Sequence, residues 1–111
     1  GHNAHGFKYI ASELKRLQSE FERQICVIGF AREKSITPIL EMLPKQAYYI
    51  FTQASSPRAL AAESLAQQGA EQGLHGEVQP TVAKAIARAR ELATERDMIF
   101  IGGSNFVVAE I

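Results

Sequence analysis

The sequence predicts an α/β domain of three layers, in which a mainly parallel β-sheet lies between helices on both of its faces. Short apolar runs of the kind found in fully buried strands alternate along the chain with segments of helical periodicity. The 111 residues, 46% of them hydrophobic, suffice for one compact domain and are too few for two. We therefore expect a single domain over residues 1–111, with ligands beyond the carboxyl ends of the strands.

Four segments have the character of strands. Residues 25–30 and 47–52 are continuous apolar runs rich in β-branched or aromatic side chains, as expected of strands covered on both faces. Residues 77–79 leave room for only a short strand before Pro80, and residues 97–101 form the last strand. All four are short enough to belong to one parallel sheet.

Helical segments separate these strands. Residues 7–21 carry an apolar stripe at steps of three and four, formed by Phe7, Ile10, Leu14, Leu17 and Phe21. Helices are also expected over 38–43 with Thr37 as a cap, from Ser56 and Pro57 to about residue 72, over 82–92 with Thr81 as a cap, and from about residue 106. The resulting order, αβαβαβαβα, predicts a Rossmann-like fold.

Composition and charge argue against several functional classes. Twelve basic residues balance twelve acidic ones, so the chain has no overall field that would attract nucleic acid or an anionic membrane. No apolar run approaches the roughly 20 residues of a membrane-spanning helix. Residues 1–6 lack the pattern of a secretory signal, and Cys26 has no second cysteine to pair with. We therefore expect a cytoplasmic protein in which Cys26 is an inert core residue.

Candidate site residues lie in four loops at strand ends or helix starts. His2 and His5 lie in the first, but without a nearby cysteine or acidic residue they make a poor ligand set, and no metal site is expected. The loop at 31–37 contains Arg32 and Lys34, which, together with free backbone N–H groups, could hold a carboxylate or phosphate. A solvated charged turn is the alternative reading of that loop.

The other two loops also suit anions. Arg58 adds a guanidinium to the loop at 53–58, while Ser104 presents a hydroxyl after two glycines that let the backbone approach a ligand. The chain contains neither G-x-G-x-x-G nor G-x-x-x-x-G-K-[ST], so it does not form a dinucleotide or triphosphate cradle by itself.

Four segments, taken together and in order, resemble the carboxy-terminal domain of folylpolyglutamate synthases and dihydrofolate synthases, within the Mur ligase superfamily. The first is GHNAHG at 1–6, which is similar to the family motif D-x-x-H-N-x-x-G, and the second is GFAREKSI at 29–36, which is similar to a strand followed by a D-K-D turn. The third is TQASSPRA at 52–59, which is similar to a loop that runs from a threonine to an arginine. The fourth is FIGGSNFVVAE at 100–110, which is similar to the motif G-S-x-F/Y-x-V. The aspartate of the first motif would precede Gly1, and Glu33 and Ser35 replace the acids of the second.

This resemblance implies an ADP-forming ligase that adds L-glutamate to a folate or dihydropteroate through an acyl phosphate. An upstream P-loop domain would bind ATP and Mg²⁺, and this domain would close over it. By itself the domain is then expected to bind no cofactor and to be inactive, and a monomeric enzyme is expected. Whether the parent makes dihydrofolate, extends polyglutamate tails or does both stays open.

The resemblance also implies roles for individual residues. His2 is the catalytic candidate and, with Asn3, approaches the nucleotide. Lys34 and Ser104 would bind glutamate, and Arg58 is a further site candidate. The alternatives are a freestanding Rossmann-like or flavodoxin-like module for a small anion or nucleotide, and an interaction domain without a ligand. A site motif at Gly1 favours a piece of a longer chain.

Overall fold

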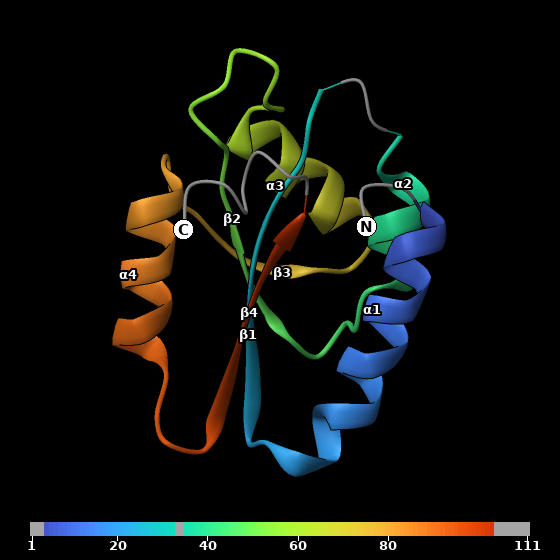
Figure 1. The fold of residues 1–111 in the computed structure, drawn as a ribbon, viewed down its shortest axis with the longest axis vertical. Coiled ribbons are helices and arrows are strands. Elements are labelled where there is room, and N and C mark those ends of the chain that lie inside the picture. The colour runs from blue at the N-terminus through green and yellow to red at the C-terminus, as the bar shows by residue number, and fades with distance from the viewer. Residues whose placement is uncertain (1–3, 33–34, 104–111) are drawn as a thin grey trace.

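The computed structural model describes residues 4–32 and 35–103, with the backbone alone for residues 4 and 5 (Figure 1). Its helices are α1 (Ala4–Leu17), the short 3-10 helix η1 (Gln18–Glu20), α2 (Thr37–Met42), α3 (Ala62–Glu71) and α4 (Val82–Leu92). Its strands are β1 (Arg23–Gly29), β2 (Tyr48–Phe51), β3 (His75–Val78) and β4 (Asp97–Gly103). The alternation of helices and strands predicted from the sequence is confirmed over these residues.

The four strands form one parallel sheet in the order β3-β2-β1-β4. The chain first moves outward from β1 through β2 to β3, and then crosses back so that β4 lies on the other side of β1. The direction of winding therefore reverses at β1 and β4. In sheets of this kind, ligands bind beyond the carboxyl ends of the strands at that reversal.

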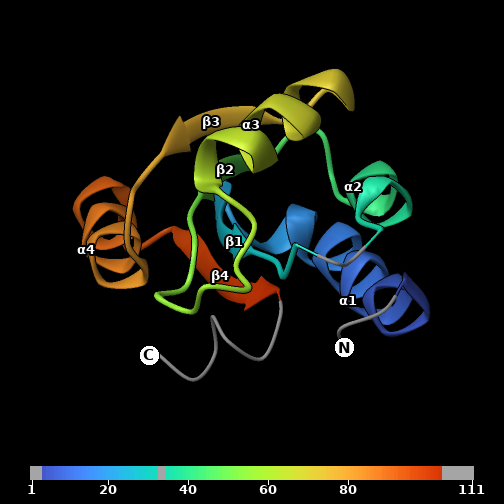
Figure 2. The same ribbon diagram turned by 90° about the horizontal axis from the view of Figure 1, so that it is seen from above.

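Helices cover both faces of the sheet, which confirms the predicted three-layer α/β class. Figure 2 shows α4 on one side of the sheet and α1 and α2 on the other. The core under α1, α2 and α3 includes Phe7, Leu14, Leu40, Leu65, Cys26, Ile28, Tyr49 and Phe51. The core under α4 consists of Ile25, Val27, Ile50, Ala85 and Ala89. Neighbouring residues of β1 thus point to opposite faces, as expected of a strand buried on both sides.

Cys26 belongs to this core and is fully buried. Burial raises the pKa of its thiol to about 12, because an apolar environment disfavours the thiolate. The side chain therefore stays protonated and unreactive at neutral pH. This agrees with the inert role predicted for Cys26.

The third helix does not start at Ser56 and Pro57, as the sequence predicted. It starts at Ala62, whose N–H donates to the Gln53 side-chain oxygen at 2.8 Å. Ser56 instead stabilises a turn, because its Oγ accepts from the Arg58 N–H at 3.1 Å. Serine followed by proline favours turns as well as helix starts, and here the turn forms.

Other predicted boundaries differ by smaller amounts. Thr81 caps α4 as predicted, with its Oγ1 accepting from the Lys84 N–H at 3.1 Å. Thr37 is not a cap, since it is already the first residue of α2. Phe21 is 36% exposed and not part of the buried stripe, because the helix gives way to η1 before reaching it. The helix predicted from about residue 106 lies outside the described residues.

A polar cluster joins β2, β3 and α4. The Glu77 carboxylate accepts from the Tyr48 hydroxyl at 2.6 Å, the Arg88 Nε at 2.9 Å and the Gln79 side-chain amide at 3.1 Å. Burial disfavours the charged form of Glu77, but the hydrogen bonds from Tyr48, Arg88 and Gln79 outweigh it, so its pKa lies below the ordinary value of 4.5.

Replacing the Glu77 carboxylate should make the free energy of unfolding less dependent on pH. We expect Glu77→Gln to lower the free energy of unfolding at pH 7 by about 1–2 kcal/mol, because the three donors lose a charged acceptor. A lowered folded-state pKa contributes stability above the unfolded pKa, and this contribution disappears as pH falls through the folded pKa. Urea unfolding of both proteins between pH 7 and pH 3 should show the difference shrinking below about 4.5. A constant difference would contradict this.

Gly76 allows β3 to approach β2 closely. A Cβ at this position would lie 1.7 Å from the Tyr49 carbonyl oxygen, whereas a Cβ at Gly73 would meet nothing nearer than Lys45 Cδ at 3.8 Å. We expect Gly76→Ala to lower the free energy of unfolding by about 2 kcal/mol or more, since two paired strands must separate. Gly73→Asn is the control, because asparagine tolerates the positive φ of 83° there. Equal losses in thermal melts would refute the role of the close approach.

Candidate functional site

The carboxyl edge of the sheet is the candidate site, because it gathers the ends of three strands. Seven residues of β1 pair with seven of β4, from Arg23 opposite Asp97 to Gly29 opposite Gly103, so the two strands end together. Directly after β2, the Thr52 N–H donates to the Ile28 carbonyl at 2.9 Å. Helix α1 runs opposite to the strands and begins at this edge, as Figure 1 shows. Helix starts are favourable surroundings for anions.

The loops that follow β1 and β2 are joined at this edge. Ala31 and Ala59 form an isolated antiparallel bridge. On either side of it, the Arg32 N–H donates to the Arg58 carbonyl and the Leu60 N–H to the Phe30 carbonyl, both at 2.8 Å. The two predicted anion-binding loops are therefore joined where the first begins, at residues 30–32, and where the second ends, at residues 58–60.

Gly102 and Gly103 have a structural role within the domain. A Cβ at Gly103 would lie 1.9 Å from the Gly29 carbonyl oxygen, and one at Gly102 would lie 2.4 Å from the ring of Phe100. Gly103 also has a φ of 129°, which side chains rarely allow. The sequence suggested that these glycines admit a ligand, whereas the contacts described here are with the neighbouring strand and with Phe100.

Four of the five predicted site residues, His2, Asn3, Lys34 and Ser104, lie outside the described residues. In the sequence each is within two positions of a described residue at this edge, namely Ala4, Ser35 or Gly103. The fifth, Arg58, is exposed on the loop after β2, and its carbonyl is bonded to Arg32. His75 is exposed in β3.

Thr52 is a polar group at this edge to which sequence reasoning assigned no role. Its side chain is fully buried, and its hydroxyl has no hydrogen-bond partner within the part of the chain that the structure describes. The sequence did contain a signal for this buried polar group, because Thr52 follows an otherwise apolar strand. Buried hydroxyls usually have partners, so a hydroxyl with none among residues 4–32 and 35–103 is a notable feature next to the candidate site.

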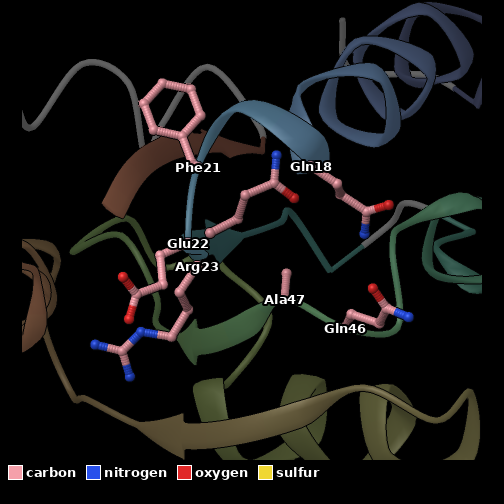
Figure 3. A pocket seen from close by; sticks show the side chains of 7 residues that line it. Gln18, Phe21, Glu22, Arg23, Gln46 and Ala47 are labelled. Carbon is pink, nitrogen blue, oxygen red and sulfur yellow. The ribbon is translucent and has the colours of Figure 1, made fainter. Parts of the chain in front are cut away.

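A small cavity of about 60 Å³ lies at the opposite edge of the sheet (Figure 3). It is lined by Gln18, Phe21, Glu22, Arg23, Gln24, Gln46 and Ala47, around the amino ends of β1 and β2. The Gln24 amide donates to the Leu14 carbonyl at 2.7 Å and so ties the last turn of α1 to β1. This cavity is therefore separate from the loops that the sequence analysis selected.

The described residues form neither a metal site nor a membrane-spanning helix. Within 4–32 and 35–103, no three side chains of histidine, cysteine, aspartate or glutamate come together as metal ligands. No helix in the same ranges is long and apolar enough to cross a membrane.

Comparison with known protein families identifies the class of protein to which this fold belongs. The family described as Mur ligase, glutamate ligase domain, matches residues 1–105, and the chain belongs to this family. No curated protein sequence matches the chain.

Solved structures of folate ligases share its fold. Escherichia coli FolC in complex with DHPP and ADP is 27% identical, with a TM-score of 0.86 over 99% of this chain and 26% of FolC. Mycobacterium tuberculosis folylpolyglutamate synthase complexed with ADP and AMPPCP is 28% identical, with a TM-score of 0.82 over 98% of this chain and 26% of that one. The chain thus spans about a quarter of the length of these enzymes.

A third structure supports the fold alone. It is the bifunctional folylpolyglutamate synthase/dihydrofolate synthase with Mn, AMPPNP and L-glutamate bound, which is 21% identical and has a TM-score of 0.76. The match covers 99% of this chain and 26% of the chain of that enzyme.

Replacing Thr52 should show whether its hydroxyl has a partner in this domain. We expect Thr52→Val to leave the melting temperature unchanged or to raise it, because a buried hydroxyl without a partner costs about 1–3 kcal/mol and valine has nearly the same shape. Thr81→Val is the matched control and should lose about 1 kcal/mol, since it removes the cap of α4. A comparable loss in both variants would mean that Thr52 is hydrogen-bonded in solution.

Proposed function

We propose that this chain is the carboxy-terminal domain of an ADP-forming ligase that adds L-glutamate to a folate or dihydropteroate. The main support is the match of residues 1–105 to the glutamate ligase domain family, together with the fold shared with folate ligases over nearly the whole chain. A freestanding module with the same fold would explain the sheet, but not the family match.

In the proposed reaction, the acceptor carboxylate first takes the γ-phosphoryl group of ATP, so an acyl phosphate forms and ADP leaves. The glutamate amine, after losing a proton, then attacks the acyl carbon, so a C–N bond forms, the C–O bond breaks and phosphate leaves. Little covalent chemistry is required of the protein. Its contribution is to hold glutamate by its two carboxylates, leave the amine free and stabilise the charge that develops.

The candidate edge suits the binding of glutamate. It combines helix starts with the Arg32 and Arg58 loops, and we propose that Lys34 and Ser104 bind the carboxylates of glutamate. His2 and Asn3 directly precede α1, and we place them toward the nucleotide, with His2 at the reacting phosphoryl group. These positions match the family motifs in the sequence.

The chain does not provide a site for ATP by itself. It has no glycine-rich phosphate loop, so ATP and Mg²⁺ would be bound chiefly by a separate P-loop domain of the same protein. We propose that the two domains close on each other around the substrates, which excludes water from the acyl phosphate. We also propose a monomeric enzyme of the cytoplasm, where ATP and folates are available to it.

Steady-state kinetics of a longer enzyme that contains this domain would test the assignments. We expect Lys34→Ala and Ser104→Ala to raise the Michaelis constant for glutamate with kcat nearly unchanged, because they remove contacts made equally in the ground and transition states. His2→Ala should lower kcat by about 100-fold, the usual loss when a donor to a developing charge is removed. Lys84→Ala, on the exposed surface of α4, is the control and should change neither constant.

The outcomes test the ligase activity and the roles of individual residues separately. If the enzyme forms no ADP in response to glutamate and a folate or dihydropteroate, the proposed function is wrong. If it does, but Ser104→Ala leaves the glutamate dependence intact, the function stands and the role of Ser104 is wrong.

A further inference from the structure

A groove lies between α1 and α2, on the face of the sheet opposite α4. It has a volume of about 350 Å³ and is lined by Lys8, Ala11, Ser12, Lys15 and Met42. Figure 2 shows the two helices next to each other on this side of the molecule. Ala11 and Met42 pack against the core, whereas the two lysines and Ser12 are exposed. The groove therefore has an apolar base and a basic, polar rim.

The positive charge of the rim is available to a ligand. None of the described residues that line the groove is acidic, and neither Lys8 nor Lys15 forms an ion pair within the part of the chain that the structure describes. Glu13, the acidic residue of α1, pairs instead with Arg16 at 2.8 Å. A ligand that fits this groove has anionic groups at intervals and apolar groups between them.

The three rim residues are regularly spaced along α1. Lys8, Ser12 and Lys15 are four and then three positions apart, so they share one face of the helix, at steps of about 6 and 4.5 Å along its axis. In an extended chain of γ-linked glutamates, standard bond lengths place successive α-carboxylates about 6 Å apart, with methylene groups and an amide between them. Three successive carboxylates can thus meet the three rim residues, while the methylene groups lie on the apolar base.

The groove begins near the candidate site. Helix α1 starts at the carboxyl edge of the sheet, and Lys8 lies one turn, about 6 Å, beyond its first residue Ala4. Under the proposed function, a folate that already carries glutamates reacts at the carboxylate of its last unit. The earlier units must therefore leave the site, and the groove offers them a path along α1.

We propose that the groove between α1 and α2 binds the γ-glutamyl tail of a folate, with Lys8, Ser12 and Lys15 as partners of successive α-carboxylates. The identification of the ligand rests on the proposed function, and within it on the extension of such tails. The match of charge and spacing rests on the groove itself.

NMR titration of the 111-residue chain with tetra-γ-L-glutamate at low salt tests the groove directly. We expect the backbone amide signals of Lys8, Ser12 and Lys15 to shift together, and di-γ-L-glutamate to bind more weakly because it reaches fewer partners. Lys8→Ala and Lys15→Ala should each weaken the binding of the longer peptide by about threefold to fivefold, the effect expected of one exposed ion pair. Lys8→Arg keeps the charge and should retain the affinity.

Lys84→Ala, on the exposed surface of α4, is the charge-matched control and should leave the affinity unchanged. A second control is tetra-L-glutamate with ordinary α-linkages, which should bind more weakly, because its carboxylates alternate between two sides of the extended chain. Equal affinity for the two peptides, or wild-type affinity in Lys8→Ala, would overturn the inference. Because this readout does not use ligase activity, its failure is distinguishable from failure of the proposed function, which is judged by ADP formation.

Discussion

The pairing of β1 with β4 is the constraint on which the rest of the structure depends. It joins segments 74 residues apart, and at its start the Arg23 guanidinium lies 3.3 Å from the Asp97 carboxylate and 2.7 Å from the Leu92 carbonyl. Asp97 also accepts from the Thr94 N–H at 2.9 Å, and these bonds, first of all the one from Thr94, hold the pKa of Asp97 below its ordinary value. The ion pair thus aligns the end of α4 with both strands.

At the other end of this pairing, Gly29 and Gly103 are close enough that no side chain fits between them. The two strands consequently end at the same level, and the loops that carry the candidate residues leave the sheet side by side. Because β4 returns to β1 across the face covered by α4, the winding reverses here. Ligands of such parallel sheets bind beyond the carboxyl ends of the strands at this reversal, so one long-range pairing sets the position of the candidate site.

The candidate site also depends on the contact between the loops after β1 and β2. A single bridge between Ala31 and Ala59 and two backbone hydrogen bonds at 2.8 Å join the start of the first loop to the end of the second. Both loops leave strands that are firmly packed, since Ile28, Phe51 and Tyr49 are almost completely buried.

The sequence alone determined the α/β class, the presence of the buried strands β1 and β2 to within two residues, the cap at Thr81 and the family. These depend on local periodicity, local hydrogen bonds and short motifs. It misplaced the start of the third helix, since Ser56 and Pro57 suit a turn as well as a helix and only Gln53, bonded to Ala62, decides between them. Strand order and the contact between the loops after β1 and β2 were decided by the tertiary structure. Both depend on backbone hydrogen bonds between segments distant in sequence, whose register no local pattern encodes.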